Sequence, residues 1–595
     1  MTETVRACLA LAALSWRTSR LKFVLALALV MSQSLALPLA APLLARITDA
    51  ALAGDVATAS WAAAGVAVLA VAGLVGHHYG HIAYFELGEL NFLAMDRELV
   101  ELSNGSTGLE HHERPEFADK VQVLKRELDR VGWVSMSALM SSVSLAVALT
   151  VTAVLLATTS PWLLLLPAAA VPPLLAGRRA EAITAAAREA SAGESRGALH
   201  LFRLATDPAL AKEVRACRLG PQVRVRHARR WRAASAVLGR AELQALAWRS
   251  AGQVFFAVAY VSATLLVVRA TVAGRGSVGD VVLVLSLAAQ VNQQVISAVT
   301  LLQELQRLSH TLAQVRWLRQ VVEEQRPAPA DLPLPDSLRE GIRLRGVSFS
   351  YPGTQTPVLA DVDLLLPAGS SVAIVGENGA GKSTLVKLLC RFYETDAGVI
   401  EVDGVDLRRL PLPEWRERTA AGFQDFARLE FDARRSIGLG DLPRSGEDAA
   451  VLDALARANG SDLLARLDAG LDTALGLSLA GGTQLSGGQW QKLALGRAMM
   501  RRRPLLLVFD EPTAALDAQA EHQLFERYAA TAREVGKVTG AVTVLVSHRF
   551  STVRMADLIL VVAGGRIAEA GTHEELSELG GLYAQLYGLQ AAQYR

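Results

Sequence analysis

The sequence predicts a multi-domain chain, in which an all-α polytopic membrane domain precedes an α/β domain. Three observations support this fold class. Long uncharged apolar segments fill the first 310 positions, a proline-rich segment follows near residue 325, and short β-rich runs then alternate with helical runs. Hydrophobic residues make up 51% and charged residues 20% of the 595 residues, which excludes a disordered chain, a collagen and a coiled-coil rod.

The first domain is expected to cross the membrane six times. A helix needs about 20 mostly apolar residues to cross the bilayer core, and the uncharged segment 132–177 is long enough to cross twice. Residues 158–162, which read TTSPW, mark a turn inside that segment. The predicted spans are residues 23–45, 56–85, 132–157, 161–177, 250–268 and 281–303.

The Lys and Arg residues that flank the spans predict the orientation. Arg17, Arg20 and Lys22 precede the first span, which places the N-terminus in the cytoplasm. Segment 86–131 is highly charged, and segment 178–249 has fifteen Lys and Arg against six Asp and Glu. Both segments are therefore expected inside. Six spans return the chain to the cytoplasm, so we expect an integral protein of the cytoplasmic (inner) membrane with both termini inside.

The two connections on the cytoplasmic side have helical patterns rather than the composition of loops. Long structureless loops are uncommon in proteins. We therefore expect spans two to five to continue as helices well beyond the membrane. Their tips, near residues 114–123 and 212–221, are expected to contact another domain.

The composition changes at residues 325–336, which read QRPAPADLPLPD and predict a stiff, extended linker. Beyond it, the runs SVAIVG, PLLLVFD and AVTVLVS each precede a helical run. This alternation predicts a parallel sheet covered by helices. The predicted divisions are a membrane domain at 1–322, a linker at 323–338 and a second domain at 339–595, cytoplasmic by the orientation above.

A phosphate-binding loop is the strongest local signal in the second domain. The run SVAIVG leads into GxxxxGK[ST] and then into a helix, which is the context that this motif requires. Backbone amides and the helix N-terminus attract phosphate oxygens, Lys382 adds charge for the β- and γ-phosphates, and the Ser383 hydroxyl is placed to bind Mg²⁺. A glycine-rich turn without a ligand is the alternative. The predicted loop residues are Gly376, Glu377, Asn378, Gly379, Ala380, Gly381, Lys382, Ser383 and Thr384.

Two adjacent acids, Asp510 and Glu511, end the apolar strand predicted at 505–511. Open α/β sheets bind ligands at the carboxyl ends of their strands. Asp510 is expected to hold Mg²⁺, directly or through water, and Glu511 to act as general base toward the attacking water. Together with the phosphate-binding loop, these acids predict an α/β P-loop NTPase domain that hydrolyses ATP.

Two further motifs identify a family. Residues 485–489 read LSGGQ at the start of a predicted helix, and residues 546–548 read VSH at the end of a predicted strand. With these motifs, residues 340–595 closely resemble the nucleotide-binding domain of ABC transporters. The six-span region resembles the membrane domain of ABC exporters by its layout, so the chain resembles an exporter-type half-transporter.

The resemblance implies roles for further residues. Tyr351 matches the aromatic residue that stacks on adenine, with a core tyrosine as the alternative, and Gln424 matches the glutamine that senses Mg²⁺. Asp517 matches the D-loop, and His548 matches the switch histidine that contacts the γ-phosphate. The signature residues, which face the nucleotide of an opposing domain, are Ser486, Gly487, Gly488 and Gln489.

Three departures from the family pattern concern communication with the membrane domain rather than hydrolysis. Ala514 and Ala515 stand before the D-loop, where many relatives have serine or glycine. Trp490 follows the signature, where a basic or polar residue is common. The stretch GLSLAGGTQ before the signature lacks the acidic residue that is often seen in multidrug exporters.

Each motif occurs once in the chain. In the family, a nucleotide lies between the P-loop of one domain and the LSGGQ of another, so the resemblance implies a dimer of half-transporter chains. The catalytic residues Lys382, Glu511 and His548 and the LSGGQ are intact. A homodimer is therefore favoured, with a heterodimer as the alternative. The expected cofactors are ATP and Mg²⁺.

The function implied by the resemblance is ATP-driven export of a small amphipathic or apolar substrate, such as a drug, a lipid or a peptide, by alternating access. An importer with an exporter-like fold, for example for metal-chelate complexes, is the alternative. A non-transporting ABC ATPase is disfavoured, because such proteins have tandem ATPase domains and no spans. The lipid bilayer is an expected partner, and a net charge of +2 gives no reason to expect nucleic acid.

Polar residues inside the predicted spans are the candidate substrate contacts. Gln290, Gln293 and Gln294 recur at three and four residues and form one helical stripe, with Asn292 beside it. Such side chains line a cavity or bond to neighbouring helices. The other polar candidates, for which metal binding, cavity lining and helix packing are alternatives, are His77, His78 and His81.

Overall fold

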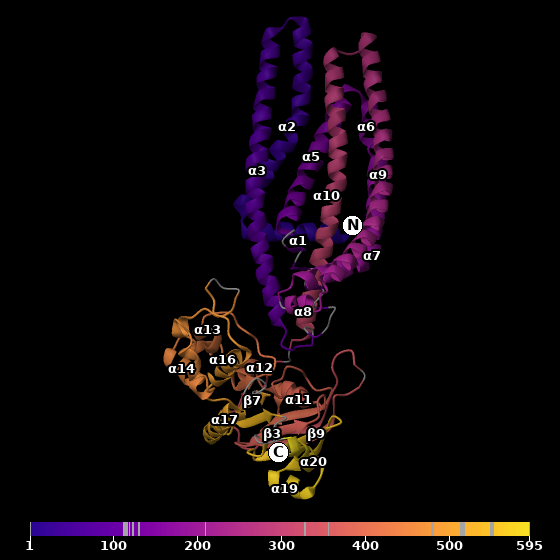
Figure 1. Ribbon diagram of the computed structural model, residues 1–595. Coiled ribbons are helices and arrows are strands. Elements are labelled where there is room, and N and C mark those ends of the chain that lie inside the picture. Colours follow the sequence, from indigo (N-terminus) through magenta and orange to yellow (C-terminus); the bar gives the residue numbers. More distant parts are fainter. Residues whose placement is uncertain are drawn as a thin grey trace. The chain divides into compact units, whose positions relative to one another are not determined.

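The computed structural model describes the chain except residues 1, 111–112, 114–116, 118–119, 122–123, 126, 129–130, 209, 327–328, 355, 478–480, 512–517, 548–552 and 594–595. Contacts divide the chain into two compact units, which are described separately below (Figure 1). The first unit comprises Met1–Ser103 and Lys120–Gln320, and the second comprises Asn104–Asp119 and Val321–Arg595. Residues 104–119 thus group with the second unit, although the predicted membrane domain runs without a break from 1 to 322.

Six long helical segments form the first unit, as the sequence predicts. Each is long and apolar enough to cross a membrane, by length and composition. The segments are Arg20–Ala53, Val56–Gly105, Val131–Thr159, Pro161–Thr206, Gly220–Val272 and Val278–Glu324. They extend beyond the uncharged stretches of the sequence, because charged residues continue the helical pattern past the apolar region. The chain is an integral membrane protein.

The first unit consists of helices only, among the residues that the structure describes. Its elements are α1 Thr2–Thr18, α2 Arg20–Ala53, α3 Val56–Gly105, η1 Val131–Ser135, α5 Met136–Thr159, η2 Pro161–Leu164, α6 Leu165–Ala168, α7 Val171–Thr206, α8 Ala211–Ala216, α9 Gly220–Val272 and α10 Val278–Glu324. Figure 1 shows that α1 runs across the long helices rather than along them.

Close backbone approaches and buried polar contacts hold this unit together. The helix α3 and the π-helical turn η1 meet at Gly88 and Gly132, where a Cβ atom on either residue would collide with the backbone of the other. Three residues further along α3, the buried Asn91 Nδ2 donates to Ser15 Oγ in α1 over 2.8 Å. The crosswise helix α1 is therefore fixed to the bundle by a hydrogen bond as well as by apolar packing.

The second unit is built on a six-stranded sheet with the order β10-β9-β3-β8-β7-β6. The strands from β9 to β6 are parallel, and β10 pairs antiparallel with β9 at the edge. Because β3, β8 and β7 are adjacent and parallel, the residues that follow them meet at one edge of the sheet. The strands are β3 Ser371–Gly376, β6 Thr419–Gly422, β7 Leu506–Asp510, β8 Val542–Val546, β9 Leu558–Ala563 and β10 Arg566–Gly571.

A second, antiparallel sheet has the order β2-β1-β4-β5, with strands β1 Gly341–Phe349, β2 Leu359–Pro367, β4 Ala397–Val402 and β5 Val405–Asp406. One buried core joins both sheets to α11. The helices α13, α14 and α16 lie together in a separate lobe of this unit (Figure 1). The helices are η3 Leu407–Arg409, α11 Lys382–Leu389, α12 Leu412–Glu417, α13 Ala433–Gly438, η4 Leu442–Arg444, α14 Asp448–Arg457, α15 Ser461–Leu464, η5 Gly470–Asp472, α16 Gly487–Met499, α17 Ala518–Thr539, α19 His573–Leu579 and α20 Leu582–Gln593.

Candidate nucleotide-binding site

The loop between β3 and α11 forms the cradle that the sequence predicts. Gly376, Gly379 and Gly381 have φ angles of +151°, +81° and +107°, which L-residues with a side chain rarely adopt. A Cβ atom at Gly376 would also collide with the backbone carbonyl of Val562 in β9. These glycines therefore allow the loop to turn tightly at the start of α11, where its amides can face an anion.

Lys382 stands at the start of α11, and its side chain turns back over the loop. Its Nζ donates to the carbonyl oxygens of Gly376 and Glu377 over 2.9 and 2.8 Å. Burial lowers the pKa of Lys382, and the nearby carboxylates of Glu511 and Asp510 oppose that shift. The ammonium thus lies in the middle of the cradle, bonded to two backbone oxygens that a phosphate group can replace as its partners.

Asp510 ends β7 beside Ser383, which donates a hydrogen bond to it. Its side chain is buried, and its Oδ1 has no hydrogen-bond partner among the described residues. Burial raises the pKa of Asp510, while a hydrogen bond from Ser383 acts in the opposite direction. A buried carboxylate oxygen without a partner, next to a hydroxyl, is a donor set that suits the hard cation Mg²⁺.

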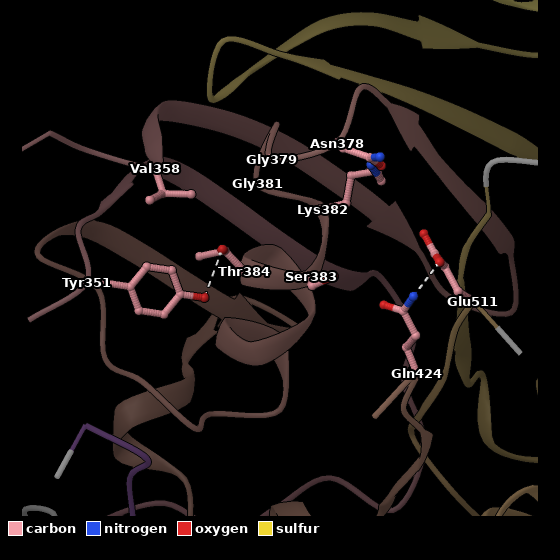
Figure 2. Close-up of a pocket in the computed structure, with 10 residues that line it drawn as sticks. All are labelled: Tyr351, Val358, Asn378, Gly379, Gly381, Lys382, Ser383, Thr384, Gln424 and Glu511. Atoms are coloured by element: carbon pink, nitrogen blue, oxygen red, sulfur yellow. Dashed lines mark hydrogen bonds between the residues drawn. The ribbon is translucent and has the colours of Figure 1, made fainter. Parts of the chain in front are cut away.

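Glu511 follows Asp510 in an unusual backbone conformation, with φ +46°. Its Oε2 accepts a hydrogen bond from Gln424 Nε2 over 2.8 Å, and Figure 2 shows the two side chains pointing toward each other. Left-handed backbone at a residue other than glycine costs energy and persists only where its surroundings hold it. The two residues are far apart in sequence, and the fold brings them together.

Tyr351 lies on the other side of the cradle. Its hydroxyl and Thr384 Oγ1 are 3.1 Å apart and share a hydrogen bond, which is drawn in Figure 2. Edge-on contacts with Phe349 and Tyr393, at ring distances of 5.2 and 5.5 Å, fix the orientation of its ring. Tyr351 is half-buried rather than a core residue, so part of its surface remains available to a ligand.

A pocket of about 750 Å³ joins these side chains (Figure 2). It is lined by Tyr351, Val358, Asn378, Gly379, Gly381, Lys382, Ser383, Thr384, Gln424 and Glu511. All but Val358 were predicted from the sequence; Val358 precedes β2 as one apolar residue among many, so no sequence signal singles it out. Gly376, Glu377 and Ala380 belong to the same loop without lining the pocket. Asp510, which accepts a hydrogen bond from Ser383, is not among the lining residues either.

The signature residues are outside this pocket. Ser486 is the N-cap of α16, and its side chain accepts from Gln489 N over 3.3 Å. The Gln489 Oε1 in turn accepts from Ser486 N over 2.8 Å. This reciprocal capping box satisfies two amides at the helix start. Gly487 and Gly488 begin the helix, so backbone amides remain exposed there. The predicted Asp517 and His548, and also Ala514 and Ala515, lie outside the described residues.

The polar stripe of the sixth span divides between two environments. Gln290 Nε2 donates to the Leu37 carbonyl of α2 over 3.0 Å, and Gln294 Nε2 donates to Thr152 Oγ1 of α5 over 3.1 Å. Gln293, on the same helix, is exposed, and Asn292 is half-buried. Gln290 and Gln294 therefore connect helices, which supports the helix-joining alternative for these two residues.

The histidines of the second span also have partners within the bundle. His77 Nδ1 and Gln33 Nε2 are 3.0 Å apart, while His78 and His81 contact aromatic rings. Within the described part of the chain, no group of three or more His, Cys, Asp and Glu side chains is arranged to hold a metal ion. The contact of His77 with Gln33 joins α3 to α2, whereas those of His78 and His81 lie within α3.

Comparisons with known proteins agree with this geometry. The sequence profile described as "ABC transporter" matches residues 359–514. The chain is 41% identical over 252 residues to an ATP-dependent lipid A-core flippase of Methylococcus capsulatus, covering 42% of this chain and 40% of the relative. It is 42% identical over 260 residues to a mitochondrial potassium channel ATP-binding subunit of Homo sapiens, covering 43% of this chain and 34% of the relative. Each match thus spans less than half the length of the curated relative.

The fold resembles a solved structure over nearly its whole length. A bacterial Atm1-family ABC exporter with ATP bound superimposes with a TM-score of 0.79 at 24% identity, covering 96% of this chain and 99% of the other. The chain therefore combines six apolar helices with one ABC nucleotide-binding domain, in the fold of ABC exporters. It carries the ABC transporter domain that its P-loop and signature predict.

Proposed function

We propose that this protein is an ATP-driven membrane transporter that works as a dimer of identical chains. One observation carries the proposal: the same chain contains a pocket lined by a P-loop lysine and a glutamate, and six helices apolar enough to cross a membrane. The ABC relatives, among which are proteins called flippases, support the same reading.

In this proposal, the residues of the pocket hold ATP at both ends. Tyr351 offers an aromatic face to the base, and the loop amides and Lys382 surround the phosphate groups. Ser383 and Asp510 would hold Mg²⁺, with Gln424 close by, and the ion would neutralise charge on the β- and γ-phosphate oxygens. When the loop lysine turns to a phosphate group, it exchanges two backbone carbonyls for a stronger, charged partner.

Glu511 is proposed to accept the proton of the attacking water. Its carboxylate bonds to Gln424 in this structure, so it must give up or share that bond to reach a water molecule. Gln424 thereby links the presence of the γ-phosphate and metal to the ability of Glu511 to accept a proton. His548 is proposed to contact the γ-phosphate, and Asp517 to act at the dimer interface, on the family pattern alone.

The dimer is proposed because the signature does not take part in the pocket of its own chain. Ser486 to Gln489 form the start of α16, and none of them is among the residues that line the pocket. A second chain that presents Ser486 and the amides of Gly487 and Gly488 would close the open side of the pocket. Two ATP molecules would then hold two domains together until hydrolysis releases them.

For substrate and direction, we propose export of a small amphipathic or apolar molecule from the cytoplasmic side of an inner membrane, with the second unit and both termini in the cytoplasm. The flippase names of the relatives support a lipid-like substrate. The arginine-rich segment 178–249 supports the orientation.

Transport assays in sealed vesicles test this function. The purified protein is reconstituted with the ATPase domain outside, and ATP-dependent movement of fluorescent lipids and apolar dyes is followed. Movement into the vesicle supports export. Movement out of preloaded vesicles indicates the importer, and ATP hydrolysis that no substrate alters, together with no flux, would contradict transport by this chain.

A further inference from the structure

Residues 104–119 begin in the last turn of the long helix α3 but belong by their contacts to the second unit. Leu109 N donates to the Phe392 carbonyl over 3.1 Å. The Arg416 guanidinium donates to the Thr107 carbonyl and, over 2.8 Å, to the Arg391 carbonyl. The segment is therefore attached to the stretch that follows α11, on the domain that holds the nucleotide pocket.

A charged contact extends this attachment toward the pocket. Glu113 Oε1 accepts from Lys387 Nζ over 2.9 Å, and both side chains are only partly exposed, at 38% and 30%. Lys387 stands on α11, the helix that starts at the P-loop lysine. The contact thus joins residues 104–119 directly to the P-loop helix.

The same ammonium group also lies over two aromatic rings, one of which, Tyr351, lines the pocket. Lys387 Nζ is 5.1 Å from the ring centre of Tyr351 and 5.7 Å from that of Tyr393. These distances are typical of cation–π contacts. Burial acts against the charge, but the hydrogen bond to Glu113, followed by Tyr351, raises the pKa of Lys387. The group remains a cation throughout the neutral range.

Tyr351 is in turn bound to the P-loop, through the hydrogen bond between its hydroxyl and Thr384 Oγ1. A continuous series of contacts therefore runs from Glu113 through Lys387 to Tyr351 and Thr384. The ring that is proposed to meet the base is held at its hydroxyl by the P-loop helix and beside its ring by Lys387. Loss of the cation removes one of the restraints on this ring, which also include its edge-on contacts with Phe349 and Tyr393.

We propose that Lys387 is a positioning residue, which orients Tyr351 for the nucleotide base and makes the affinity for that base depend on the docking of Glu113. This inference rests on the proposed ATP site and adds a residue to it. By linkage, base binding must strengthen the docking of residues 104–119 by the same factor by which docking strengthens base binding. The affinity for a ligand that has phosphate groups but no base should therefore not depend on Lys387 or Glu113.

The test compares two ligands on the full-length protein in nanodiscs. Dissociation constants of ATP and of inorganic tripolyphosphate are measured for the wild type, Lys387→Met and Glu113→Ala. Each variant is expected to weaken ATP binding about threefold to tenfold, as the loss of a partly exposed cation–π contact implies, and to leave tripolyphosphate unchanged. Lys387→Arg, which keeps a cation over the ring, should retain most of the affinity. In the double variant, the loss of ATP affinity should be smaller than the product of the two single fold-losses.

A lysine from another ion pair of the same unit provides the control. Lys492 Nζ lies 2.7 Å from Asp462 Oδ1, with side-chain exposures of 20% and 53%, and Lys492→Met should change neither constant. Equal weakening of both ligands by Lys387→Met, or unchanged ATP affinity, would overturn the positioning role. If the wild type binds neither ligand, the proposed nucleotide site itself is wrong, which is a different outcome.

Discussion

In the second unit, the polar side chains that line the site gather in one pocket, whereas in the six-helix unit the polar side chains are dispersed along the helices. The pocket holds a lysine that bonds only to backbone oxygens, and a buried Asp510 oxygen without a partner among the described residues lies next to it. In the helices, Asn91 donates to Ser15 and Gln294 donates to Thr152. The first arrangement gathers polar groups around one space for a ligand. The second uses amide donors to join helices, while Asn91 Oδ1 and Gln294 Oε1 also have no hydrogen-bond partner among the described residues.

This difference has a general physical basis. A buried polar group without a partner is costly, and a ligand that bonds to it removes that cost. Inside a bilayer, a polar side chain is costly unless another helix or water satisfies it. We therefore expect a specific ATP site in the second unit and a less specific, apolar path for the substrate in the six-helix unit. The following experiments test the contrast, from the largest expected effect to the smallest.

The largest effect is expected from Glu511→Gln. Removal of the general base should lower kcat for ATP hydrolysis about 10²- to 10⁴-fold and leave nucleotide affinity nearly unchanged, because the amide still fits the site. Phosphate release and equilibrium nucleotide binding measure the two properties. Glu414→Gln, at an exposed position of α12, is the matched control. Hydrolysis at the wild-type rate would exclude Glu511 as the base.

A mixed dimer should separate a shared site from a self-contained one. One chain carries Lys382→Ala and the other carries Ser486→Arg, so that one of the two composite sites is free of both changes. The purified mixed dimer is expected to reach up to roughly half of the wild-type rate, while each mutant homodimer is nearly inactive.

If all three dimers are equally inactive, either the sites are shared and must act together, or they are not shared. Crosslinking distinguishes these two explanations. A crosslink between cysteines placed in the P-loop and in the opposing signature indicates shared sites that must act together. Failure to crosslink in the presence of ATP contradicts the composite site.

Asp510→Asn should impair function and raise the stability of the folded protein. Burial raises the pKa of Asp510 in the folded state. Near that pKa, the folded protein therefore binds more protons than the unfolded chain. Because of this group, the stability of the fold decreases as pH rises. The neutral amide removes the penalty, so Tm at pH 7 without metal should rise by a few degrees and depend less on pH.

The metal response gives the complementary measurement. Mg²⁺ with nucleotide should raise the Tm of the wild type but not that of Asp510→Asn, because the carboxylate ligand is gone. Asp425→Asn, at an exposed position whose charge also raises the pKa of Asp510, should keep the metal response. Equal stabilisation of wild type and Asp510→Asn by Mg²⁺ would remove Asp510 from the metal site.

The smallest effect is expected from Gln294→Leu in the helical unit. The change removes the hydrogen bond to Thr152, and such bonds between membrane helices contribute about 0.6 kcal/mol on average. Thermal unfolding should shift down slightly, and all substrates should be affected alike. Gln293→Leu, at an exposed position of the same helix, should leave stability unchanged. If Gln294→Leu instead alters the response to one substrate only, the residue contacts substrate.

Much of the nucleotide site could be predicted because its residues stand in short, contiguous motifs. A strand, a glycine-rich loop and a helix that follow one another along the chain require one local geometry, and nine of the ten lining residues were predicted from the sequence. The six apolar helices were predictable for a similar reason, because the thickness of a bilayer sets the length of the segment.

Other features depend on contacts between distant residues, and no local pattern encodes them. The bond from Gln424 to Glu511 and the ion pair of Glu113 with Lys387 join residues far apart in the chain. The attachment of residues 104–119 to the second unit depends on such contacts as well. The side chain of Gln489 accepts a hydrogen bond from the Ser486 amide at the start of its own helix, and its contact with a nucleotide stays a prediction.

The left-handed backbone at Glu511 has an evolutionary consequence. This conformation costs a side-chain-bearing residue about 1–2 kcal/mol, a cost that glycine avoids and asparagine reduces. Substitution of Glu511 by glycine or asparagine would therefore remove the general base and also relieve this backbone cost. Selection for folding alone would favour loss of the glutamate. Its presence in a lineage therefore indicates continued selection for ATP hydrolysis. A duplicated copy freed from that selection would be expected to lose this residue early and keep its fold.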